Sequence, residues 1–105
     1  MPTEGDDVTG DQDALEEIRR QLDVVDRDLV DVLARRSALI MDVVRYKRVR
    51  GMAVVDRDRE DRMLDRIGAV AAEAGLDPRI ARQVLRSIID AFTLLEVEEL
   101  GPGHP

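Results

Sequence analysis

An uninterrupted apolar seam runs through the first half of this chain and limits the folds open to it. From Leu15 onward, apolar residues recur at alternating steps of three and four, a helical period of about 3.5. No proline or glycine interrupts the seam before Gly51. A helix of about 35 residues is roughly 50 Å long, whereas a compact domain of about 100 residues has a radius of gyration of only about 13 Å. One end of the helix must overhang unless a second chain covers it, so we predict an obligate dimer. The seam comprises Leu15, Ile18, Leu22, Val25, Leu29, Val32, Leu39, Val43 and Tyr46.

Two shorter helices are predicted after the long one. The second begins near Asp56 and ends at Gly75, a residue that suits a helix C-terminus. The third has Asp77 as its N-cap and Pro78 at its first position, and it ends near Leu100. Both carry apolar residues on one face, and no strand pattern appears. The chain is therefore predicted to be all-α, with three helices.

Composition divides the chain into three predicted regions. Residues 1–14 contain five acids and no base and are predicted to form a disordered acidic leader. Residues 15–100 are predicted to form the helical domain, and residues 101–105 a flexible tail. Subtracting the five leader acids from 23 leaves 18 acids against 16 bases. This near balance offers no basic excess for nucleic acid.

Several classes of function are excluded by what the sequence lacks. Without cysteine there are no disulfides or thiolate metal sites, and a reducing cytoplasm is compatible. No apolar run reaches the ~18 residues of a membrane helix, and no signal peptide is recognised, so we expect a cytoplasmic protein. The one histidine, His104, lies in the tail, and neither a phosphate loop nor a metal-ligand spacing occurs. If the chain is an enzyme, its chemistry needs no cofactor, no metal and no proton shuttle.

Two cations occupy the apolar face of the long helix. The seam assigns a core position to Arg36, between Val32 and Leu39. An unpaired guanidinium there would cost several kcal/mol, so an anion must meet it. Lys47, the only lysine, follows three turns later and about 20° off the same line. Taken singly, Arg36 could be satisfied by a salt bridge to Glu60, and Lys47 could be a surface residue.

The stretch "VVDRDREDR" contains seven consecutive charged residues after two valines. Projection at about 100° per residue places Glu60 near the middle of the apolar stripe of the second helix, with Asp56 on the same line at the cap. Arg59 falls on the flank, and the remaining charges point toward water. Two cations and one carboxylate are therefore predicted to converge on a seam that should be apolar.

These residues resemble the all-helical chorismate mutases. The family pattern has an Arg early in the long helix, an Ile/Val-Asp step, an Arg within "LxxR", a Lys eleven residues later, and then "V-x-D-x-x-R-E". This chain supplies Arg19, Val25-Asp26, Arg36, Lys47 and "VDRDRE" at matching spacing. The third helix, from "GLDP" through "SIID", is also similar.

The resemblance implies a cofactor-free Claisen rearrangement of chorismate to prephenate in aromatic amino acid (Phe/Tyr) biosynthesis. Such a reaction requires a flexible dicarboxylate to be folded and charge on the ether oxygen to be stabilised. The resemblance implies that Arg36 and Arg19 hold the two carboxylates and that Arg59 supports the carboxylate side. It implies that Lys47 donates a hydrogen bond to the ether oxygen. Glu60 and the backbone of Asp56 would accept the hydrogen bond of the ring hydroxyl.

Arg19 and Arg36 lie 17 residues apart, about 25 Å along one helix. That distance is too long for one small substrate, so Arg19 must come from the other chain of an intertwined helical homodimer with shared active sites. An activating partner enzyme of the aromatic pathway is left open, because some short relatives are activated by the enzyme that starts it.

Two positions depart from the family pattern. Phe92, with Thr93 beside it, stands where a small polar residue is frequent, and Glu96 stands where many members have a glutamine facing the ether oxygen. An ionised carboxylate cannot donate a hydrogen bond, so activity is predicted to be greatest on the acidic side if Glu96 faces the substrate. The alternative interpretation is that Glu96 is a surface acid.

Three alternatives remain open from the sequence. Relatives act on 4-amino-4-deoxychorismate, and others eliminate pyruvate from isochorismate. The cations handle dicarboxylates common to all of these substrates and discriminate poorly among them. The alternative from another class is a non-catalytic helical dimerisation module.

Overall fold

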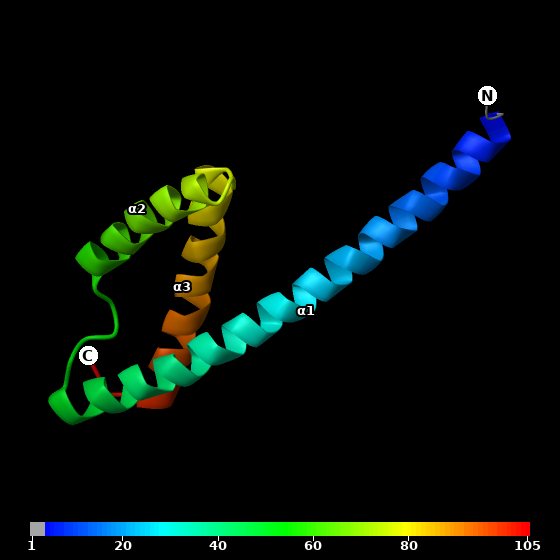
Figure 1. Cartoon of the computed structure of the whole chain (residues 1–105). Helices are drawn as coiled ribbons and strands as arrows, with labels where there is room; N and C mark the ends of the chain where they lie inside the picture. The colour runs from blue at the N-terminus through cyan, green and yellow to red at the C-terminus, as the bar shows by residue number, and fades with distance from the viewer. Residues whose placement is uncertain (1–3) are drawn as a thin grey trace. The chain divides into compact units, whose positions relative to one another are not determined.

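The part of the chain that the structure describes forms three α-helices. The computed structural model describes residues 4–105, with side chains from Gly10 onward. The helices are α1 (Glu4–Arg50), α2 (Arg57–Glu73) and α3 (Pro78–Leu100), and no strand occurs within the described residues (Figure 1). The all-α prediction is confirmed.

The long helix α1 contains 47 residues, which corresponds to roughly 70 Å. It begins at Glu4, eleven residues before the apolar seam starts. The first three residues of the expected acidic leader lie outside the described residues, and the leader from Glu4 onward is helical. α1 ends at Arg50 because Gly51 adopts a positive φ of 64°, a conformation that ends a helix readily when no Cβ is present.

The ends of α2 and α3 follow the predicted capping residues. Asp56 caps α2 by accepting a hydrogen bond from the backbone N–H of Arg59 at 3.1 Å. Asp77 caps α3 by accepting from the N–H of Arg79 at 2.9 Å, with Pro78 as the first helical residue. The turn between the two helices passes through Gly75, whose φ is 76°. These local signals fix where α2 and α3 begin and end.

The described chain divides within α1 into two compact units, one ending at Arg36 and one spanning Ser37–Pro105. In the second unit α2 and α3 pack against each other across the Gly75 turn (Figure 1). Each helix contributes one buried apolar residue to this unit: Val44, Ala71 and Ile89. So small a set of buried residues provides little hydrophobic stabilisation for one chain alone.

Much apolar surface is left uncovered. Six seam residues on the first part of α1 are exposed, namely Leu15, Ile18, Leu22, Val25, Leu29 and Val32. α2 and α3 also form an apolar groove of about 330 Å³, lined by residues that include Ile67, Val70, Ala74, Leu76, Ile80 and Val84. Contiguous apolar surfaces of this kind mark association sites.

The C-terminal residues contact the end of α1 and the loop that follows it. Arg48 Nη2 donates to the Glu99 carbonyl oxygen at 2.6 Å, and His104 Nε2 lies 2.6 Å from the Met52 carbonyl oxygen. The division into leader, domain and flexible tail stays a prediction. Among the described residues, no helix has both the length and the apolar character needed to cross a membrane.

Candidate active site

Lys47 is held at two points near the end of α1. Its Nζ donates to the carbonyl oxygen of Val54 at 2.8 Å and to Glu96 Oε1 at 2.9 Å. The side chain is only 16% exposed. The ammonium group is therefore positioned inside the unit, and Lys47 is not an ordinary surface lysine.

Glu96 reaches Lys47 from the last turns of α3. Its side chain is 8% exposed, so it is not a surface acid at the helix end. A buried carboxylate requires a charged or hydrogen-bonding partner, and Lys47 supplies one. The loop carbonyl of Val54 was not predicted from the sequence as a partner of the ammonium, because backbone acceptors leave no pattern in side-chain identities.

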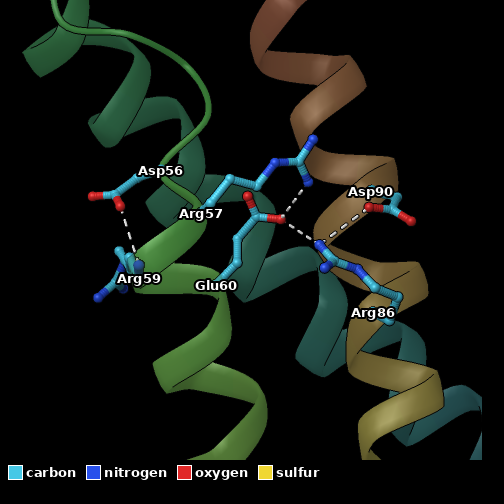
Figure 2. Close-up of polar contacts among 6 residues, drawn as sticks. All are labelled: Asp56, Arg57, Arg59, Glu60, Arg86 and Asp90. Carbon is cyan, nitrogen blue, oxygen red and sulfur yellow. Dashed lines mark hydrogen bonds and ion pairs between the residues drawn. The ribbon is translucent and has the colours of Figure 1, made fainter.

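Glu60 lies one turn into α2 and is 11% exposed. Its inward orientation is the one that helical periodicity predicted. The carboxylate forms an ion pair with Arg86 of α3, and Arg57 lies 3.7 Å from the same oxygen (Figure 2). Figure 2 shows both guanidinium groups directed at the same oxygen of the Glu60 carboxylate.

Arg86 was not singled out by sequence reasoning. Its Nη2 contacts Glu60 and also lies 3.3 Å from Asp90 Oδ1, one turn further along α3. The Glu60 carboxylate raises the pKa of Arg86, and the charges of Asp90 and Asp61 act in the same direction. The available signal was its spacing, because Arg86 precedes the buried Ile89 by three residues on the border of the apolar stripe.

Three further predicted residues of this unit lie at the start of α2 and on α3. Asp56 occupies the N-cap of α2, and the Arg59 backbone donates to it while the Arg59 side chain is exposed. Phe92 is half-buried on α3, one turn before Glu96.

Two further predicted residues belong to the first unit of the chain. Arg19 is exposed on α1 and forms a 2.9 Å ion pair with Glu16. Such an exposed pair contributes little to stability, so Arg19 is readily redirected to another anion. Arg36 is half-buried on α1. Their roles at a site stay predictions.

The arrangement is suited to binding and polarising a substrate. Among the described residues no group of three or more His, Asp or Glu side chains could hold a metal ion. The second unit offers a fixed ammonium donor at Lys47 and a buried carboxylate acceptor at Glu60. Fixed donors and acceptors of this kind stabilise developing charge without reorganisation.

The described part of the chain is thus a small helical protein that buries charged pairs, with its one lysine held between a loop carbonyl and a carboxylate. Residues 18–97 match the model of the family described as chorismate mutase type II. The chain belongs to this family.

Characterised relatives match at modest identity. The chorismate mutase of Methanocaldococcus jannaschii is 29% identical over 86 residues, covering 82% of this chain and 87% of that protein. A 4-amino-4-deoxychorismate mutase of Streptomyces venezuelae is 34% identical over 67 residues, covering 64% and 65%. The T-protein of Haemophilus influenzae is 31% identical over 74 residues, and this chain spans 20% of its length. No solved structure matches the chain significantly.

Proposed function

We propose that the chain is a chorismate mutase that converts chorismate to prephenate in the biosynthesis of phenylalanine and tyrosine. The observation that carries this proposal is the lone lysine, buried and held by Val54 and Glu96, in a chain of the chorismate mutase type II family. A Claisen rearrangement breaks a C–O bond and forms a C–C bond within one molecule. It needs no nucleophile and no cofactor, only a bound conformer and a donor for the ether oxygen.

In this mechanism Lys47 donates to the ether oxygen as negative charge develops there. Its two contacts, at 2.8 and 2.9 Å, hold the ammonium before substrate binds. A donor already in place is worth more to the transition state than one that must be ordered during reaction. Glu96 accepts a hydrogen bond from the Lys47 ammonium, so in this mechanism Glu96 and the substrate share that donor.

The other assigned residues bind the ends of the substrate. Arg36 and Arg19 hold the two carboxylates, for which the planar guanidinium is suited. Arg59 supports the carboxylate side. Glu60 and the backbone of Asp56 accept the ring hydroxyl, and Phe92 covers the site from α3.

The active form is proposed to be a homodimer with shared sites. The exposed seam on α1 and the apolar groove of α2 and α3 support this, because each leaves apolar surface in water when the chain is alone. The separation of Arg19 from Arg36, about 25 Å along a helix, requires the two residues at one site to come from different chains.

Incubation of the purified chain with chorismate tests the proposed activity directly. Absorbance and mass spectrometry should show prephenate formed without added metal or cofactor. Parallel incubations with 4-amino-4-deoxychorismate and isochorismate test the related activities, the first of which is carried by the name of the Streptomyces relative. Consumption of none of the three substrates would favour a non-catalytic dimerisation module.

Analytical ultracentrifugation tests the dimer separately. We expect a dimer at micromolar concentration and unfolding that depends on protein concentration. A stable monomer that unfolds cooperatively would contradict it. A cytoplasmic location and activation by a partner enzyme of the aromatic pathway remain predictions from the sequence.

A further inference from the structure

The Glu60 carboxylate is already engaged by a cation from another helix. Arg86 of α3 contacts Oε1 of Glu60 across the packed pair of helices (Figure 2). The Glu60 side chain is 11% exposed and that of Arg86 35%, so solvent screens this pair less than it screens the ion pairs on α1. Arg86 also lies 3.3 Å from Asp90, which fixes the guanidinium from its own helix.

The contact gives Glu60 a fixed orientation and a compensated charge. Arg86 approaches through Nη2 alone, since both of its ion pairs use this atom. Arg57 lies 3.7 Å from the same oxygen of Glu60, and its side chain is 77% exposed. A guanidinium at this position stays protonated, because Glu60 raises the pKa of Arg86 above a value that is already high.

A carboxylate that is paired with a cation distinguishes a hydroxyl from an ammonium. A carboxylate without that cation would bind both groups. A neutral hydroxyl donates a hydrogen bond to a carboxylate whether or not a cation lies nearby. An amine of the aliphatic kind is protonated at neutral pH. An ammonium that approaches Glu60 also approaches the Arg86 guanidinium, and the like-charge repulsion opposes its binding.

We propose that Arg86 is a specificity-determining positioning residue that makes Glu60 select a ring hydroxyl over a ring ammonium. This inference rests on the proposed function, since it assigns Glu60 to the ring substituent. It predicts that the chain prefers chorismate to 4-amino-4-deoxychorismate. Arg86 acts through Glu60 and does not itself touch the substrate.

The test compares kcat/KM for these two substrates in wild type and in Arg86→Gln. Wild type should favour chorismate by about tenfold or more, the discrimination expected of one contact to a charged group. In Arg86→Gln the ratio should fall by about tenfold, with KM for the amino substrate decreasing, because the repulsion is gone. Arg86→Lys keeps the positive charge and should keep most of the preference.

Arg57→Gln is the matched control. It removes the same charge from the same carboxylate oxygen, but from an exposed arginine. Solvent screening predicts a change in the ratio of less than about threefold. Circular dichroism of each variant confirms that the helices are retained.

A measurement on wild type alone covers the case in which Arg86→Gln does not fold. The preference for chorismate should diminish as pH rises above the pKa of the substrate amine, because the amine then binds uncharged. Lys47 and Glu96, which contact each other, are assigned to parts that the two substrates share, so any effect of pH through them cancels in the ratio.

The outcomes separate this inference from the proposed function. If wild type converts neither substrate, the proposed function fails and the inference fails with it. If wild type is active but prefers the amino substrate, or if Arg86→Gln lowers both activities without changing their ratio, only the role of Arg86 is overturned. A preference that does not change with pH, in an active enzyme, also overturns it.

Discussion

Lys47 loses its conformational freedom when the chain folds, because Val54 and Glu96 both accept from its ammonium group. A lysine side chain gives up about 1.5–2 kcal/mol of rotamer entropy on being fixed. This entropy is lost when the chain folds, before the substrate binds. A surface lysine would lose it during the reaction instead, so the location of Lys47 contributes to its proposed role as well as its charge.

Replacement of Lys47 by alanine should reduce turnover more than binding. The contact to the ether oxygen strengthens as the C–O bond breaks, so its loss falls on kcat. Loss of one such donor costs about 3 kcal/mol, a factor of a hundred or more. Steady-state kinetics on chorismate measure the effect, and Lys47→Arg should also be impaired because a planar fork does not replace a compact ammonium.

A control is needed because Lys47→Ala leaves the buried Glu96 without its partner. The double variant Lys47→Ala, Glu96→Gln removes that uncompensated charge and should recover stability but not turnover. A raised KM with unchanged kcat in a folded variant would show that Lys47 only binds the substrate.

Glu96→Gln should raise activity at neutral pH and flatten the pH profile. The glutamine carbonyl can still accept from Lys47, while its amide can donate to the ether oxygen as an ionised carboxylate cannot. In wild type only the protonated acid can donate, so activity should be greater on the acidic side. The gain at neutral pH should be up to about tenfold, the worth of one neutral hydrogen bond. Rates from about pH 5 to 8 measure it, and identical flat profiles for both proteins would remove Glu96 from the reaction.

At the scale of helices, α3 depends on the cap at Asp77. Arg79 holds the Asp77 carboxylate through its guanidinium at 2.7 Å and through its backbone N–H at 2.9 Å. The guanidinium contact, followed by the backbone contact, lowers the pKa of Asp77 below its usual value. The ionised carboxylate thus stabilises the fold above the unfolded pKa of about 3.9, and this stabilisation is lost as pH falls through the lower folded value.

Asp77→Asn should reduce the dependence of stability on pH at acidic pH. Asparagine still caps the helix, but its side chain cannot ionise. The melting temperature of the variant should therefore depend less on pH below about 4 than that of wild type. Thermal scans at one protein concentration measure this, with Glu98→Gln at the other end of α3 as the charge-matched control. Equal pH dependence in wild type and Asp77→Asn would show that the carboxylate charge is irrelevant to the cap.

Features that depend on neighbours along the chain were predictable from the sequence. Asp56, Gly75 and Asp77 mark helix ends because each suits its capping or turn position chemically. The helical periodicity was sufficient to predict that Glu60 points inward. The ion pair between Glu60 and Arg86 was not predictable, because it depends on how α2 packs against α3. The start of α1 at Glu4 was also missed, since the acidic segment before Leu15 lacks the apolar seam that revealed the rest of the helix.

At the scale of the whole molecule, the chain buries few apolar residues and exposes many. Val44, Ala71 and Ile89 are the buried apolar residues within the described part of the chain. Each apolar residue that passes from water to an interface contributes about 1.5–3 kcal/mol. Burial of the six exposed seam residues of α1 would therefore contribute to the stability of the proposed dimer.

Mixing two inactive variants tests whether each active site is shared between chains. Arg19→Ala and Arg36→Ala homodimers should both be inactive, because each lacks one carboxylate-binding arginine at both sites. In a heterodimer, one site receives Arg36 from the first chain and Arg19 from the second, while the other site lacks both. An equal mixture that exchanges freely should recover about a quarter of wild-type activity, since half the dimers are mixed and one of their two sites is intact.

Two differently tagged chains, purified together, verify the exchange. Each variant treated alone in the same way is the control. No recovery in verified heterodimers would show that Arg19 and Arg36 do not act together across chains, even if the protein is dimeric.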